Sequence, residues 1–488
     1  MELDPKLKKA MKPAYWKRWN EKVQKTIDEN IEKYRKADAD WKIKGLKAGT
    51  KVEVEQISHA FIFGAHIFNY DQLGTDERNE KYKELYGTLF NSATVAFYWK
   101  TLEPVEGEPR FDGEYRDTAA YWNTVKDPKN EPHWRRPAPG PVIDFCESKG
   151  IRIHGHPLVW GNFKWHFPEW LNAKLPAALH KSWLPENWSN SWSPVSEKIN
   201  MENDFSAEQL EAMFPDFAVE LETSMAKRIA RIAFKYGKRV QSWDVCNESA
   251  EDYNLGRMVP DSAICKSVYG MMPGDYTYRA FKLADSMLPK TAKLNINDYY
   301  LKQPYVDQTK DLMERGCKID IMGAQMHLFD PQICLDIADG KSDVQDPLVV
   351  MKTMETLSQT NLPLHLSEIT ITSPNNDERG QAIQAVITYN LYRLWFSIKN
   401  MMGITWWNVV DDCGAPGEPS VSGLFSRDME PKPSAKILQE LINKEWKTRT
   451  SVKAGAGGSV KFRGFRGKYR LTWTDANGEI HMNFLDLE

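Results

Sequence analysis

The sequence predicts an α/β fold: a closed (β/α)8 TIM barrel with a small accessory β domain formed by the N- and C-terminal segments. Short apolar segments with strand character alternate eight times with longer segments of helical periodicity, and this alternation is typical of a closed parallel barrel. Segments at both ends of the chain instead alternate apolar and polar residues, as half-buried strands do. The 488 residues suffice for one large barrel and a smaller attachment.

Residues 1–40 are predicted to contribute an amphipathic helix, over residues 14–37, that packs on the main body. Its apolar residues recur at three- and four-residue spacing, with Lys and Glu on the other face: Trp16, Trp19, Val23, Ile27, Ile31 and Tyr34. Two strand patterns follow, around residues 41–44 and 51–55, in which apolar residues alternate with Lys and Glu.

The C-terminal segment is predicted to form a β-hairpin around Asn477-Gly478. Apolar residues alternate before this dipeptide and again after it: Tyr469, Leu471 and Trp473, then Ile480, Met482 and Phe484. Because a lone hairpin is marginal in water, we expect it to pair with the strands near the N-terminus. Residues 41–58 and 449–488 are therefore predicted to form the small β domain, and residues 59–448 the barrel.

The barrel strands and helices are expected to alternate along the chain. Strands are predicted over residues 61–68, 89–97, 151–159, 240–245, 293–296, 319–325, 362–369 and 403–409. Helices are predicted over residues 217–236, 275–287, 305–315, 347–359 and 378–400. Residues 121–141 and 172–215 carry Pro and Trp and are predicted to be loop insertions. Loops that follow barrel strands build the substrate face of such folds.

Composition argues against several classes of partner. The net charge is −3 and no strong basic tract is present, so no nucleic-acid partner is expected. No apolar run is long enough to span a membrane, and no signal peptide is visible. The six cysteines form no C-x-x-C pair, which argues against a zinc or redox site. We expect no metal and no cofactor.

Two predicted strands end on a carboxylate, at Glu248 and at Glu368. Polar residues at the carboxyl ends of barrel strands point into the mouth of the barrel. A lone glutamate at such a position is usually a surface or salt-bridged residue, but two glutamates, on the fourth and seventh strands, favour a catalytic site. Retaining glycoside hydrolysis needs two carboxyl groups about 5–5.5 Å apart, one to attack carbon and one to protonate the leaving oxygen. Asn247 precedes Glu248, and its amide is suited to binding a sugar 2-hydroxyl.

The chain resembles glycoside hydrolase family 10, the xylanase family, through several segments that occur in the family's order. They are residues 154–160, 243–248, 294–299, 323–328, 367–368, 403–407, 423–425 and 431–433. The resemblance implies a barrel without metal that hydrolyses β-1,4-xylan within the chain and with retention. It also implies that Glu248 is the general acid/base and Glu368 the nucleophile.

The resemblance further implies a set of sugar-binding residues. His156 and Trp160 match those that bind the sugar next to the cleavage point, and Gln325 and His327 match those that flank the nucleophile. Trp407 matches a sugar platform, whereas its neighbour Trp406 is expected to pack in the barrel. The remaining candidates for substrate binding are Asn247, Tyr299 and Lys100.

The sequence departs from the family pattern around the glycone, the part of the substrate that bonds to the nucleophile. The family's second-strand Glu-Asn pair is missing from residues 91–100, where Tyr98 stands in place of a Lys and Lys100 follows the Trp instead. Gly161 replaces a His, and Thr370 replaces an Asp that supports the sixth-strand His. We hypothesise a changed glycone pocket, for a decorated xylan or a different β-glycan. Comparable rates on linear xylan and arabinoglucuronoxylan would argue against it.

Other interpretations remain open. His154 and His156 share a strand face and could chelate a metal, but the sequence places no carboxylate or Cys close by. A core role for His154 and sugar binding for His156 are favoured. The chain could also be a non-catalytic glycan-binding protein or act on another polysaccharide; the presence of both Glu248 and Glu368 favours an enzyme. We expect a monomer, secreted or periplasmic, that acts on a polysaccharide or oligosaccharide.

Overall fold

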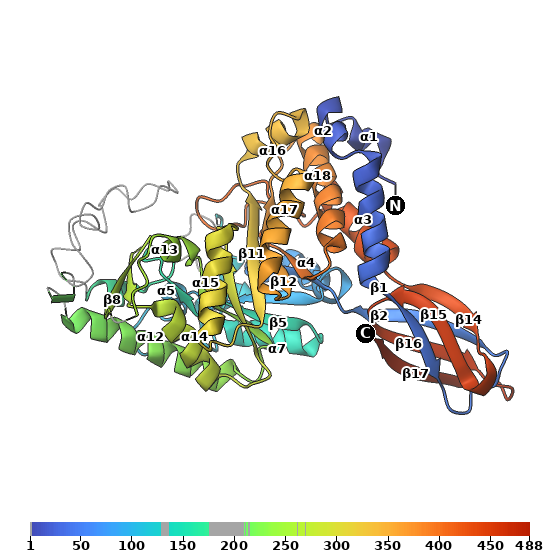
Figure 1. The fold of residues 1–488 in the computed structure, drawn as a ribbon, viewed down its shortest axis with the longest axis horizontal. Helices are drawn as coiled ribbons and strands as arrows, with labels where there is room; N and C mark the ends of the chain where they lie inside the picture. Colours follow the sequence, from blue (N-terminus) through green and yellow to red (C-terminus); the bar gives the residue numbers. More distant parts are fainter. Residues whose placement is uncertain are drawn as a thin grey trace.

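The computed structural model describes residues 2–127, 136–174, 209, 211–212, 215–260, 262–268 and 270–488. Most of the predicted insertion over 172–215 therefore lies outside the described residues. The central element is a closed parallel barrel (Figure 1), in which β10 pairs with both β7 and β11, and β13 pairs with β3. This closure confirms the predicted fold class.

The barrel strands fall where the apolar segments predicted them. They are β3 (Ile62–His66), β4 (Ser92–Ala96), β5 (Arg152–His156), β7 (Ser242–Asn247), β10 (Lys293–Asp298), β11 (Ile321–Leu328), β12 (Leu364–Ile371) and β13 (Met401–Trp406). The two-residue strand β6 (Val159–Trp160) also pairs with β7. Nearly every residue of these strands is buried, because side chains fill the barrel on one side and helices cover the other.

Helices surround the barrel. The long ones are α4 (Asp76–Thr88), α7 (Pro139–Ser148), α12 (Pro215–Tyr236), α14 (Tyr276–Met287), α15 (Gln303–Glu314), α16 (Pro331–Asp339), α17 (Pro347–Leu357), α18 (Glu378–Ser397) and α19 (Pro433–Glu440). Shorter ones are α5 (Trp99–Leu102), η1 (Tyr115–Asp117), α6 (Ala119–Trp122), α8 (Glu169–Asn172) and α13 (Ala250–Asn254). A small hairpin of β8 (Ile264–Ser267) and β9 (Gly270–Pro273) follows α13. No described helix combines the length and the apolar composition needed to cross a membrane.

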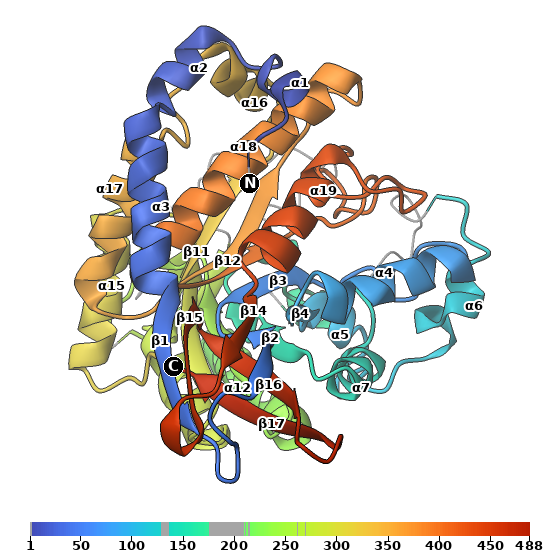
Figure 2. The same cartoon turned by 90° about the vertical axis from the view of Figure 1, so that its right-hand side faces the viewer.

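The N-terminal region forms three helices, so the prediction of one continuous helix over 14–37 is wrong. They are α1 (Pro5–Lys8), α2 (Pro13–Arg18) and α3 (Glu21–Arg35). The chain breaks at Asn20, whose side chain accepts a hydrogen bond from the backbone N–H of Val23 and so begins a new helix. Helix α3 lies beside α18 (Figure 2), and Arg35 donates a hydrogen bond of 2.8 Å to the carbonyl of Met401.

Strands from both ends of the chain form the accessory β domain, seen at the lower right of Figure 1. Strand β1 (Lys36–Lys42) pairs with β15 (Ser459–Phe465). A second sheet has the order β14 (Arg449–Lys453), β2 (Lys51–His59), β16 (Gly467–Thr474) and β17 (Ile480–Leu487). Between the two sheets lies an apolar core separate from the barrel core, and its fully buried members include Val52, Val460, Tyr469 and Leu471.

The hairpin of β16 and β17 turns at the predicted Asn477-Gly478. The carboxylate of Asp475 accepts hydrogen bonds from the backbone N–H groups of Asn477 and Glu479, at 2.8 and 3.0 Å. Gly478 has a φ of +85°, which only glycine adopts without strain. The second set of alternating apolar residues lies on the outer face of the sheet and is exposed: Ile480, Met482 and Phe484.

Candidate active site

The two predicted carboxylates lie at the same end of the barrel. Glu248 directly follows β7, and Glu368 lies inside β12, which continues past it to Ile371. Parallel pairing aligns Gln325 of β11 with Glu368, and Asn297 of β10 with Asn247 of β7. Barrel closure therefore brings together polar side chains from four strands.

One amide nitrogen joins the two glutamates. Nε2 of Gln325 lies 3.2 Å from Oε1 of Glu248 and 3.2 Å from Oε1 of Glu368. These two oxygens are therefore no further apart than twice that distance. This limit fits the short carboxyl separation of retaining glycosidases rather than the wider gap that inverting enzymes need for a water.

Glu248 sits in a strained turn that its neighbours hold in place. Its φ is +55°, in the left-handed region that non-glycine residues rarely adopt. Its backbone N–H donates to the carbonyl of Asn297 at 2.8 Å. The carboxylate of Asp298 accepts hydrogen bonds from the next two backbone N–H groups, those of Ser249 and Ala250, at 2.7 and 2.8 Å. The Glu248 side chain stays half-buried, and its Oε2 accepts the indole N–H of Trp160 at 2.9 Å.

Glu368 is held more deeply, with 4% of its surface exposed. Its Oε1 accepts a hydrogen bond of 2.7 Å from Nδ2 of Asn297. Nε2 of His327 lies 3.3 Å from its Oε2, and Nε2 of His156 lies 3.7 Å from its Oε1. Ser367 donates to Oδ1 of Asn297 at 2.5 Å, which orients the Asn297 amide toward Glu368.

The surroundings raise the pKa of both carboxyl groups. Burial, followed by the charge of Glu368 and then that of Asp298, raises the pKa of Glu248 to about 8, although hydrogen bonds from Gln325 and Trp160 oppose the rise. Burial raises the pKa of Glu368 to about 7, and His156 opposes it. Both groups therefore keep a proton to a higher pH than an exposed glutamate does, and an ionised Glu368 favours the protonated form of Glu248. A protonated acid beside an ionised carboxylate is the division of roles that two-carboxylate catalysis requires.

Asp244, which sequence reasoning missed, orients His156. Its Oδ2 lies 2.9 Å from Nε2 of His154 and 2.8 Å from Nδ1 of His156, so the other nitrogen of His156 faces Glu368. Burial alone would raise the pKa of Asp244, but the interactions with His154 and His156 together hold it well below its usual value. In the sequence Asp244 lies four residues before Glu248 on the same predicted strand. Asn297 was missed as well.

Several predicted sugar-binding residues lie around this pair. Asn247 is buried and contacts Gln325, with 3.1 Å between its Oδ1 and the Gln325 Nε2. The ring of Trp407 lies 5.4 Å from that of His156 and 6.1 Å from that of His327. Trp406 is instead fully buried, and its indole N–H donates to the carbonyl of Asn408.

Two predicted residues lie in other contacts. Tyr299 is 40% exposed, and its hydroxyl donates to Glu251 at 3.2 Å. Nζ of Lys100 lies 2.5 Å from Glu169 and donates to the carbonyl of Lys164 at 3.2 Å. The exposed position of Tyr299 keeps it available to a long substrate, whereas Lys100 is already paired.

Thr370 takes over the contact expected of an Asp. Its Oγ1 lies 2.9 Å from Nδ1 of His327. Burial lowers the pKa of His327 to about 4, and Glu418 opposes this shift only in part. His327 is therefore neutral at ordinary pH and acts on Glu368 as a hydrogen-bonding group rather than as a cation.

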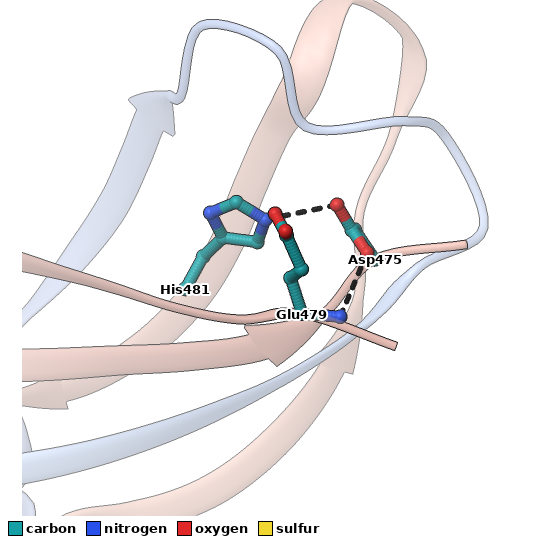
Figure 3. Close-up of side chains that lie close together, drawn as sticks. All are labelled: Asp475, Glu479 and His481. Atoms are coloured by element: carbon teal, nitrogen blue, oxygen red, sulfur yellow. Dashed lines mark hydrogen bonds and ion pairs between the residues drawn. The ribbon is translucent and has the colours of Figure 1, made fainter. Parts of the chain in front are cut away.

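One group of side chains in the described part of the chain has metal-ligand spacing, and it lies outside the barrel. Asp475, Glu479 and His481 converge at the turn of the accessory hairpin (Figure 3). The Asp475 carboxylate is already engaged there by two backbone N–H groups and by Nε2 of His481 at 3.0 Å. These hydrogen bonds close the hairpin turn, which accounts for the three side chains lying close together.

Comparison with known proteins identifies a family for most of the chain. The model of the family "Glycosyl hydrolase family 10" matches residues 80–441. The chain is 23% identical over 300 residues to the bifunctional endo-1,4-β-xylanase XylA of Ruminococcus flavefaciens, with 60% of this chain and 26% of that one covered. It is 22% identical over 333 residues to the anti-sigma-I factor RsgI6 of Acetivibrio thermocellus, with 68% and 34% covered.

The fold likewise has solved counterparts. Xylanase 10B of Thermotoga maritima superposes with a TM-score of 0.53 at 19% identity, covering 79% of this chain and 96% of that one. The chain spans about a third of the length of the curated relatives it matches. The family match covers most of the chain, with the strands that carry Glu248 and Glu368 inside it. The chain therefore belongs to glycosyl hydrolase family 10.

Proposed function

We propose that this protein is a retaining glycoside hydrolase that cleaves β-1,4-xylan through a covalent glycosyl-enzyme intermediate. The observation that carries the proposal is the shared contact of Glu248 and Glu368 with Nε2 of Gln325, which limits the distance between the two carboxyl groups. Family membership supports the substrate class.

In the first step Glu368 attacks the anomeric carbon of the bound sugar. Glu248 gives its proton to the glycosidic oxygen as the bond to the leaving sugar breaks. In the second step Glu248, now a carboxylate, takes a proton from a water molecule, which attacks the same carbon and frees Glu368. Two inversions at one carbon leave its configuration unchanged.

The roles of the surrounding side chains follow from these steps. Asn297 and His327 hold the Glu368 carboxylate for attack. Asn247 contacts Asn297 and Gln325, and its amide is the candidate for binding a 2-hydroxyl. Trp160 contacts Glu248 and so lies toward the leaving group. Trp407 lies on the Glu368 side and so toward the glycone.

A second candidate is hydrolysis of a decorated xylan or of another β-glycan. The observation that favours it is the altered glycone surroundings, in which Thr370 supports His327 and Tyr98 packs against His156, with 5.4 Å between the ring centres. The family resemblance implies cleavage within the polysaccharide chain. Such cleavage requires several sugars to bind on the glycone side of Glu368 in addition to those on the leaving-group side.

A panel of polysaccharides separates these functions. We expect reducing sugar to be released from linear xylan, arabinoglucuronoxylan or both, with the products first appearing as the β-anomer in proton NMR. Glu248→Ala and Glu368→Ala should abolish release, and Glu314→Gln, at an exposed position on α15, is the matched control. Initial appearance of the α-anomer would refute retention, release only from other β-glycans would refute the substrate, and binding without release would indicate a glycan-binding protein.

A further inference from the structure

The chemistry of the two glutamates divides the site into two sides. Glu368 bonds to the glycone, so the side chains beyond it, away from Glu248, face the glycone. Glu248 protonates the leaving sugar, so its surroundings face the other half of the substrate. This assignment, like the inference below, rests on the proposed function.

A buried aromatic cluster lies against His156 and His327, the two histidines next to Glu368, and so toward the glycone. Its apolar members are Phe68, Ala96 and Trp407, with Tyr98 and Phe329 packed against them. The rings of Phe68 and Trp407 are 5.2 Å apart, and those of Phe68 and Tyr98 are 6.0 Å apart. Phe68 is 1% exposed and Trp407 4%. A sugar stacks only on an uncovered ring face, so the described structure leaves little of either ring for a second glycone sugar.

Arg136 lies over this cluster. Its guanidinium carbon is 4.3 Å from the ring centre of Phe68 and 5.7 Å from that of Tyr98, and the residue is 6% exposed. A cation stacked on two aromatic faces in a desolvated place is a favourable arrangement that costs energy to dismantle.

A hydrogen bond holds the backbone at Arg136 in place. Nη2 of Arg110 donates a hydrogen bond of 3.2 Å to the carbonyl of Arg136, and Arg110 also forms a buried ion pair with Asp117. The position of Arg136 thus depends on a set of buried polar contacts within the described residues. Arg136 is therefore held by buried groups and not by a mobile side chain at the surface.

The strand beneath the cluster offers little polar contact for a second sugar. At the carboxyl end of β4 the chain runs Ala96, Phe97, Tyr98, and Phe97 is fully buried against Tyr236 and Trp243. Sugar hydroxyls taken out of water need hydrogen-bond partners, and apolar side chains supply none.

We propose that Arg136, laid across Phe68 and Tyr98, closes the glycone side beyond the single sugar that bonds to Glu368, so that the enzyme removes sugars from the non-reducing end of the chain. The polysaccharide class of the proposed function is kept, and the position of the cut moves from the chain interior to its end.

Two chromogenic substrates of different glycone length test this inference. They are 4-nitrophenyl β-xyloside, with one glycone sugar, and 4-nitrophenyl β-xylobioside, with two. For the wild type we expect kcat/KM for nitrophenol release from the xylobioside to be at most about a tenth of that from the xyloside, because Arg136 and the aromatic cluster occupy the space that the second glycone sugar needs. Xylohexaose should release xylose as its first small product.

Variants identify the barrier. Arg136→Ala should raise the ratio of kcat/KM for xylobioside over xyloside by about tenfold, and Phe68→Ala should raise it in the same direction. Arg116→Ala, an exposed arginine on the same connection, should leave the ratio unchanged. The ratio does not depend on the fraction of folded enzyme, because both rates are measured on one preparation.

The outcomes separate the two proposals. A wild-type kcat/KM for the xylobioside equal to or above that for the xyloside, with xylobiose or longer products from xylohexaose, would overturn the inference and leave the proposed function standing. Hydrolysis of neither substrate, nor of xylan, would overturn the proposed function itself. A low wild-type ratio that neither variant raises would overturn the role of Arg136.

Discussion

Glu248 and Glu368 share one hydrogen-bond donor, the side-chain amide nitrogen of Gln325, which lies 3.2 Å from an oxygen of each. The shared hydrogen-bond donor couples the positions and the charges of the two carboxyl groups. Each charge raises the cost of ionising the other, and the amide offsets part of that cost. The pH dependence of the enzyme should therefore report on the contacts of the pair.

The first prediction concerns the alkaline side of the pH profile. Activity should rise as Glu368 ionises, with its pKa near 7, and fall as Glu248 loses its proton, with its pKa near 8. The indole N–H of Trp160 favours the ionised form of Glu248, so Trp160→Phe should raise that pKa. We expect the alkaline limb of kcat/KM against pH to move upward by up to about one unit. Trp170→Phe, at a Trp that bonds elsewhere, should leave the limb in place, and a downward movement in Trp160→Phe would contradict the argument.

The second prediction concerns the acid side of the same profile. Thr370→Asp should place a carboxylate beside Nδ1 of His327 and raise the pKa of this histidine from about 4. The resulting imidazolium would face Glu368 and favour its ionised form. We expect the acid limb to move to lower pH by about one unit, whereas the uncharged Thr370→Asn should not move it. Equal profiles for Thr370→Asp and Thr370→Asn would refute this coupling.

The third prediction concerns stability. The folded protein holds a proton on Glu368 up to about pH 7, above the ordinary value of 4.5, so its contribution to stability is complete at low pH and is lost as pH rises between these values. Glu368→Gln has no proton to lose. It should be stabilised relative to wild type by about 1–3 kcal/mol more at pH 9 than at pH 4, in urea unfolding. Glu314→Gln, an exposed control, should show no such pH-dependent gain, and a gain limited to low pH in Glu368→Gln would reverse the sign we derive.

The fourth prediction separates the accessory β domain from the site. Leu471 is fully buried in the small core between the two sheets, which is distinct from the barrel core. Leu471→Ala should cost the accessory domain about 2–5 kcal/mol and lower its melting temperature, while kcat/KM at 25 °C stays unchanged. Ser451→Ala on an exposed strand position is the control.

Deleting residues 450–488 should expose Val52 and Val54, and unchanged melting of that variant would argue against one joint domain.

Much of the fold was predictable because local pattern reflects local environment. The barrel strands are buried on both sides, so each is an apolar run that can be read without knowing its neighbours. The break at Asn20 was harder to see, because the apolar spacing of α2 continues into α3 while a single capping side chain ends one helix and begins the next.

The pattern of alternating strand and helix segments was sufficient to predict the fold class and to place Glu248 and Glu368 toward the carboxyl ends of two barrel strands, because parallel strands of one barrel end on the same side. Three contacts could be known only from the folded chain: Gln325 spans both carboxyl groups, Asp244 orients His156, and Arg136 lies over Phe68. The residues in these contacts are far apart in the sequence, and the contact distances depend on strand register, barrel closure and side-chain packing. A local sequence pattern does not specify these three features.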